Sequence, residues 1–75
     1  MTRGLDELPA GATGVVQSLG GGRGVTSRLI DMGFTPGVEV AVIHNRGRGA
    51  IIVLVRDVRV ALGRGQAQKI MIAEG

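Results

Sequence analysis

The sequence predicts a mainly β domain in which five short strands form a small, partly open barrel, with one short helix inserted between strands 1 and 2. Three observations predict this class. Apolar and β-branched residues recur in short runs that alternate or are continuous. The 14 glycines separate these runs at short intervals. Only the segment that begins at Val25 changes to the period of a helix.

Length and composition narrow the classes of protein further. We expect residues 1–75 to form one domain, which at this size has no spare core for a deep active site. Phe34 is the only aromatic residue, and the absence of cysteine excludes disulfides, thiolate metal sites and a thiol nucleophile. The longest apolar run, residues 50–55, is too short to cross a bilayer, and residues 1–9 lack a secretory apolar segment. We therefore expect a cytoplasmic protein that does not itself span a membrane.

The first strand is predicted over residues 12–19, where Val15 and Val16 lie in a β-branched run. Residues 20–24, GGGRG, are predicted to be a flexible connector. They do not match a phosphate-binding loop, because the G-x-G-x-x-G spacing fails at Val25 and no Gly-Lys-Ser/Thr follows.

The helix is predicted from Val25, because Val25, Leu29 and Met32 fall at positions i, i+4 and i+7. Thr26 or Ser27 is expected to supply the N-cap oxygen. The helix is therefore short and apolar on one side.

A sharp corner is predicted directly after the helix. Gly33 falls where a left-handed C′ residue is needed, and Phe34 follows at C″, where it is expected to pack against Leu29 or Ile30. In the sequence TPG that comes next, proline fixes φ and glycine accepts positive φ, as a type II turn requires. This stretch therefore ends the helix and starts a strand.

The remaining strands are predicted over residues 38–44, 50–55, 58–62 and 70–72. Valines alternate along the first of them, and the second is apolar enough to be a central strand. Residues 56–57 are expected to form a tight turn, because aspartate tolerates the left-handed conformation. A partly open barrel buries the apolar faces of these strands and protects their edges.

Nine basic side chains against six carboxylates give a net charge of +3, which raises the question of a nucleic-acid partner. The basic residues are scattered along the chain, and no aromatic residues lie between them to stack on bases. We therefore expect a solvated basic surface and no nucleic-acid partner.

Taken together, several segments resemble the FeoA family. They are L-x-x-L-P-x-G at 5–11, R-L-x-x-M-G-F-x-P-G at 28–37, V-x-V at 38–40 and V-A-L-G-R…A-x-x-I at 60–70. The resemblance covers essentially the whole chain, and the second block is its most specific part. Asp57 stands where glycine is common in the family, and Ala50 stands where proline is frequent. Both departures concern local turn geometry.

The resemblance implies an SH3-like barrel and an accessory or regulatory role in bacterial ferrous iron uptake. It also implies a partner, FeoB, which is a large membrane transporter with a cytoplasmic G domain. Similar domains form the C-terminal module of metal-dependent repressors of the diphtheria-toxin-repressor type. A stand-alone regulatory domain of this kind, or a basic nucleic-acid binder, is therefore the alternative, although the 75 residues contain no helix-turn-helix segment.

No catalytic constellation is recognisable, so we expect neither an enzyme nor a resident cofactor. The single histidine, His44, has no thiol partner and no Ser-His-Asp spacing. A tight ferrous or zinc site needs three or more converging His, Cys or carboxylate ligands. Only weak or intersubunit coordination is left, with His44, Asp31 and Glu39 as its candidates. Iron would then be the cargo of the transporter.

The helix and its exit are the expected docking surface for a partner. Arg28, Asp31, Thr35 and Pro36 are predicted to face outward, and Phe34 belongs to the same rigid corner, which needs no ordering on binding. The competing interpretation places Phe34 in the core. A groove for proline-rich peptides is not expected, because such grooves are lined with several aromatic residues.

Overall fold

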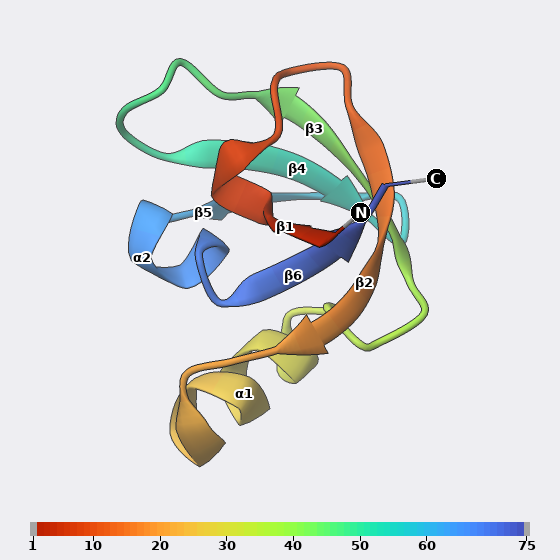
Figure 1. The fold of residues 1–75 in the computed structure, drawn as a ribbon, viewed down its shortest axis with the longest axis vertical. Helices are drawn as coiled ribbons and strands as arrows, with labels where there is room; N and C mark the ends of the chain where they lie inside the picture. Colours follow the sequence, from red (N-terminus) through yellow and green to blue (C-terminus); the bar gives the residue numbers. More distant parts are fainter. Residues whose placement is uncertain (1, 75) are drawn as a thin grey trace.

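The computed structural model describes residues 2–74, which form a curved six-stranded sheet accompanied by one longer helix (Figure 1). The elements in chain order are β1 (Thr2–Gly4), the 3-10 turn η1 (Leu5–Glu7), β2 (Thr13–Leu19), α1 (Gly22–Asp31), β3 (Glu39–His44), β4 (Ile51–Val55), β5 (Val58–Leu62), α2 (Arg64–Ala67) and β6 (Ile70–Ala73). The strand order is β1-β6-β2-β3-β4-β5, and every neighbouring pair is antiparallel. The predicted mainly β class is confirmed.

The five predicted strands all form, with boundaries within one residue of the prediction, but the predicted strand count is wrong. The sixth strand, β1, has no alternating pattern, and it becomes a strand only by pairing with β6 through Thr2↔Ala73, Arg3↔Ile72 and Gly4↔Met71. The sequence also does not predict the helical turn α2. Its four residues, RGQA, are too few for a helical period to appear in the sequence.

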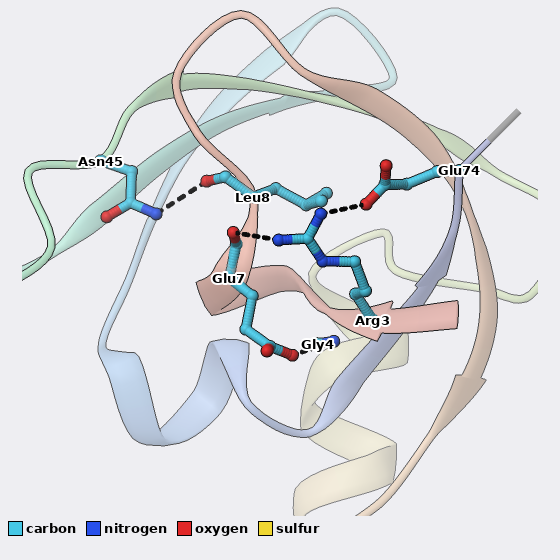
Figure 2. A network of polar contacts seen from close by, with 6 residues as sticks. All are labelled: Arg3, Gly4, Glu7, Leu8, Asn45 and Glu74. Atoms are coloured by element: carbon cyan, nitrogen blue, oxygen red, sulfur yellow. Dashed lines mark hydrogen bonds and ion pairs between the residues drawn. The ribbon is translucent and has the colours of Figure 1, made fainter. Parts of the chain in front are cut away.

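Polar contacts around Arg3 join the two ends of the chain (Figure 2). The Arg3 guanidinium forms an ion pair with Glu74 at 2.9 Å and donates a hydrogen bond to the carbonyl oxygen of Glu7 at 3.1 Å. The carboxylate of Glu7 in turn accepts the backbone N–H of Gly4 at 3.1 Å. These contacts hold η1 against the β1–β6 pair.

A second set of contacts converges on Asn45, in the loop after β3. Its side-chain amide donates to the carbonyl oxygen of Leu8 at 2.8 Å (Figure 2) and to that of Asp6 at 3.1 Å. Its side-chain oxygen accepts the backbone N–H of Gly47 at 3.0 Å and a hydrogen bond from the guanidinium of Arg64. Asn45 therefore ties η1, the β3–β4 loop and α2 together.

The core is entirely apolar and receives side chains from every element except β1. Its buried members are Leu5, Leu8, Val16, Leu29, Phe34, Val40, Val42, Ile51, Val53, Val55, Leu62, Ala67, Ile70 and Ile72. No polar or charged residue among positions 2–74 is buried. Burial of apolar area is therefore the main source of stability, at roughly 25 cal/mol per Å².

The helix α1 begins at Gly22, three residues before the predicted start at Val25. Gly21 and Gly22 take positive φ angles of 92° and 81°, which reverses the chain inside the segment predicted to be a connector. Thr26 and Ser27 are therefore inside the helix, and the prediction that one of them caps it is wrong. No side chain caps this end; the hydroxyl of Thr26 instead donates to the carbonyl oxygen of Gly20 at 3.4 Å.

The exit from α1 matches the prediction. Gly33 has φ +106° and donates its N–H to the carbonyl oxygen of Ile30 at 2.9 Å, while Phe34 donates to that of Leu29 at 3.0 Å. These two bonds are the Schellman motif. Leu29 and Phe34 are both buried in the core, whereas Ile30 is 42% exposed.

The two predicted turns are also present. Gly37 has φ +95°, and the N–H of Val38 donates to the carbonyl oxygen of Thr35 at 3.1 Å, as in a type II turn. Arg56 and Asp57 connect β4 to β5 with φ angles of 51° and 65°. Positive φ at both central residues is the type I′ geometry that matches the twist of a two-residue hairpin.

Replacing Asp57 by glycine should stabilise the protein. A Cβ at positive φ costs free energy, and glycine removes that cost while it adds entropy to the unfolded chain. We expect Asp57→Gly to raise the free energy of unfolding by about 0.5 kcal/mol in a urea titration. Asp57→Ala keeps the Cβ and is the matched control; an equal gain in both variants would contradict this explanation.

Two further glycines should respond in opposite ways to alanine. A Cβ on Gly14 would collide with Ile72 Cγ2 and lie 2.9 Å from the backbone oxygen of Ala73. Gly14→Ala should therefore lower the free energy of unfolding by about 2 kcal/mol. No heavy atom beyond the local helix backbone lies within 4 Å of a Cβ on Gly24, inside α1. Gly24→Ala should raise the free energy of unfolding by about 0.5–1 kcal/mol because alanine favours helix. Thermal unfolding, followed by circular dichroism, measures both changes. Equal shifts of the melting temperature in the two variants would contradict the packing explanation.

Candidate docking surface

The exposed side of α1 and the turn that follows it form a continuous surface, which we call the α1 exit surface and define as Arg28, Asp31, Thr35 and Pro36. Arg28 and Asp31 are exposed and lie three residues apart on the helix, so that their side chains are neighbours. Pro36 is exposed and Thr35 is half-buried. The corner thus presents a cation and an anion side by side, next to a rigid turn.

Arg56 braces this corner from the β4–β5 turn. Its guanidinium donates a hydrogen bond to the hydroxyl of Thr35 at 3.2 Å. The type I′ turn, in which Arg56 has a positive φ, reverses the chain between β4 and β5 at this point. The β4–β5 hairpin therefore adds an exposed positive charge next to the α1 exit surface. Nothing in the local sequence around Thr35 indicates this contact.

Phe34 does not belong to the surface, which corrects one of the predicted contact residues. Its side chain is 0% exposed and lies among the core residues. The Schellman motif turns Phe34 inward, because its backbone N–H must reach the carbonyl oxygen of Leu29. Its contribution is to hold the corner rigid from inside.

An open groove of about 400 Å³ adjoins the α1 exit surface, and its lining comes mainly from α1. The lining residues are Gly24, Val25, Arg28, Leu29 and Gln66. Val25 is 37% exposed, although its spacing from Leu29 predicts a core position. The first turn of α1 lies further from the sheet than its last turn, so that Val25 faces the groove (Figure 1). Gln66 lies on α2, an element that the sequence did not predict.

The three metal candidates do not come together in one chain. Glu39 and His44 occupy the two ends of β3, which at about 3.3 Å per residue places them about 16 Å apart along the strand. Asp31 lies on α1. Across positions 2–74, no group of three or more His, Asp or Glu side chains is placed to hold a metal ion.

None of the helices within residues 2–74 combines the length and the apolar character needed to cross a bilayer.

Comparison with known proteins identifies relatives along nearly the whole chain. The family model described as FeoA domain matches residues 3–74. A protein of Methanocaldococcus jannaschii, provisionally named Fe(2+) transport protein A, is 35% identical over 60 residues, which are 80% of this chain and 72% of that protein. The crystal structure of an iron uptake regulatory protein, FeoA, shares 35% identity with a TM-score of 0.92 and covers 100% of this chain and 99% of its own.

The FeoA of Stenotrophomonas maltophilia, crystallised with zinc, is 31% identical with a TM-score of 0.77, over 97% of this chain and 89% of that one. It is described as an SH3 domain protein, which confirms the SH3-like part of the predicted fold. A manganese-dependent transcriptional repressor also matches, with a TM-score of 0.89 and 24% identity over 99% of this chain and 42% of the repressor. That likeness is one of fold alone. From the family match, the identity and the fold together, the chain belongs to the FeoA family of ferrous iron transport proteins.

Proposed function

We propose that this protein is a cytoplasmic accessory or regulatory component of ferrous iron transport, which binds the cytoplasmic part of an FeoB-like membrane transporter, including its G domain. It acts by protein–protein interaction and is not an enzyme. The observation that carries the proposal is the α1 exit surface, a rigid corner with exposed charges of both signs, of which Arg28 lines the adjacent groove. Membership of an iron transport family supplies the class of partner.

The rigidity of the corner supports docking. The backbone bonds from Gly33 and Phe34 and the turn bond from Val38 fix the chain between α1 and β3 before any partner arrives. Binding to a fixed surface loses less conformational entropy than binding to a mobile one. The adjacent groove can accept an apolar side chain, while Arg28 in its lining and the exposed Asp31 three residues further along α1 favour a partner with the complementary charge pattern.

Ferrous iron is proposed to be the cargo of the transporter and not a resident cofactor of this chain. The separation of Glu39 from His44 along β3 supports this division of roles, because one ion cannot bridge the two within a single chain. Coordination through His44, Asp31 or Glu39 would be weak and would require ligands from another molecule.

A second candidate function is a stand-alone regulatory domain or a basic nucleic-acid binder. The fold likeness to a manganese-dependent repressor favours it, although this chain matches only 42% of the repressor's length. Binding of this kind would appear as oligonucleotide affinity that falls steeply with salt, because counterions are released from phosphates. Affinity for an oligonucleotide together with no affinity for the transporter domain would select this alternative.

Charge reversal on α1 should weaken transporter binding without unfolding the protein. We expect Arg28→Glu and Asp31→Lys each to raise the Kd for the purified cytoplasmic domain about threefold to tenfold, measured by isothermal titration calorimetry. Both side chains are exposed, so the unfolding midpoint should stay unchanged.

Arg46→Glu is the matched control for Arg28→Glu, since it makes the same charge change in an exposed loop. That loop, residues 45–50, lies at the opposite end of the molecule from α1 (Figure 1). Unchanged affinity in both α1 variants would remove the α1 exit surface from the proposal. A loss in Arg46→Glu equal to that in Arg28→Glu would show that the Arg28→Glu effect comes from net charge alone.

A further inference from the structure

The strand β4 is apolar on both faces, although only one face meets the core. Ile51, Val53 and Val55 point inward and are buried, whereas the alternate residues Ile52 and Leu54 point outward and are half-buried. A strand with this composition is typical of a sheet that is covered on both sides.

The strand register extends this apolar character over the neighbouring strands. Leu54 lies between Ala41 of β3 and Arg59 of β5, and Ile52 lies between His44 of β3 and Ala61 of β5. We define the outer sheet face as Thr13, Val15, Glu39, Ala41, His44, Ile52, Leu54, Arg59 and Ala61, with Ile43 beside it at the register shift of β3. Val15 and Ile43 are each 39% exposed, so that this face is open to solvent in the single chain.

The face is neither flat nor uncharged. A hollow of about 290 Å³ opens at one end and is lined by residues that include Glu39, Leu54 and Asp57. Glu39 on β3 and Arg59 on β5 stand on opposite sides of β4. Neither forms an ion pair within residues 2–74, where the ion pair present joins Arg3 to Glu74. Both charges are therefore available to a partner.

We propose that the outer sheet face binds a second copy of this chain and forms a weak, two-fold symmetric dimer. A two-fold axis that lies in the face and crosses the line from Glu39 to Arg59 at its midpoint and at right angles brings each Glu39 against Arg59 of the other copy. The same operation lays the apolar centre around Leu54 over its equivalent. Isologous interfaces require such self-complementarity, and the face provides it in charge and in apolar area.

The same observations favour a second copy over other occupants. An anionic lipid surface would select a uniformly basic face, whereas the hollow at this one carries the carboxylates of Glu39 and Asp57 together with Arg56, so that charges of both signs are mixed. Four strands about 4.8 Å apart and about five residues long span only about 19 by 16 Å. That size is at the lower end for specific interfaces, so we expect a Kd between about 10 µM and 1 mM.

The experiment is sedimentation velocity on the full chain from about 10 µM to 1 mM, where the wild type should shift from monomer to dimer. Arg59→Glu and Glu39→Arg should each raise the dimer Kd about tenfold or more, because symmetry places like charges opposite one another twice. The double variant that combines both changes should regain a Kd within about threefold of the wild type, since it restores opposite charges.

Arg46→Glu, which changes the same charge in the exposed β3–β4 loop, should leave the dimer intact. A chain that is monomeric up to 1 mM would overturn the proposal. So would a dimer that the double variant fails to restore, or one that Arg46→Glu weakens as much as Arg59→Glu does. Binding of the monomer to vesicles with anionic lipid, lost in Arg59→Glu, would assign the face to a membrane and would also overturn it.

Discussion

The left-handed conformation of Gly33 is the constraint on which the rest of the fold depends. It closes the Schellman motif, which ends α1 and directs Phe34 into the core. Phe34 is the only aromatic side chain and the largest fully buried one, so the aliphatic core is organised around it. The turn at Gly37 then aims the chain into β3. A single corner thus determines both the packing of the helix and the shape of the α1 exit surface.

The parts of the fold that the sequence predicted are those determined by neighbouring residues. Strand alternation, the Gly33 cap, the TPG turn and the Arg56-Asp57 hairpin each depend on a few consecutive side chains. The parts it did not predict depend on contacts distant in sequence. The strand β1 requires its pairing with β6, and η1 is held by Arg3, Glu74 and Asn45. The early start of α1 requires two successive glycines at positive φ.

The candidate site was predictable to a similar extent. Helical spacing sufficed to place Arg28 and Asp31 on an exposed side of α1. The groove beside them was not predictable. Gln66 lines it from α2, and the exposure of Val25 depends on how α1 is placed in the assembled fold. For Phe34, the helix-cap pattern predicted burial, whereas the docking hypothesis predicted contact with a partner. The structure shows that Phe34 is buried. For the outer sheet face, by contrast, the sequence does carry a signal. The run IIVLV of β4 contains more apolar side chains than one core can bury.

We propose that the rigid corner, the flanking charges and the adjacent groove together make α1 the docking end of this small barrel. An amide chemical-shift titration of the labelled protein with the cytoplasmic domain of an FeoB-like transporter, with and without nucleotide, tests this proposal most directly. The proposal predicts shifts concentrated on residues 28–37 and on the groove residues Val25 and Gln66. An unchanged spectrum at high partner concentration, or shifts confined to the β3–β4 loop or the outer sheet face, would contradict it.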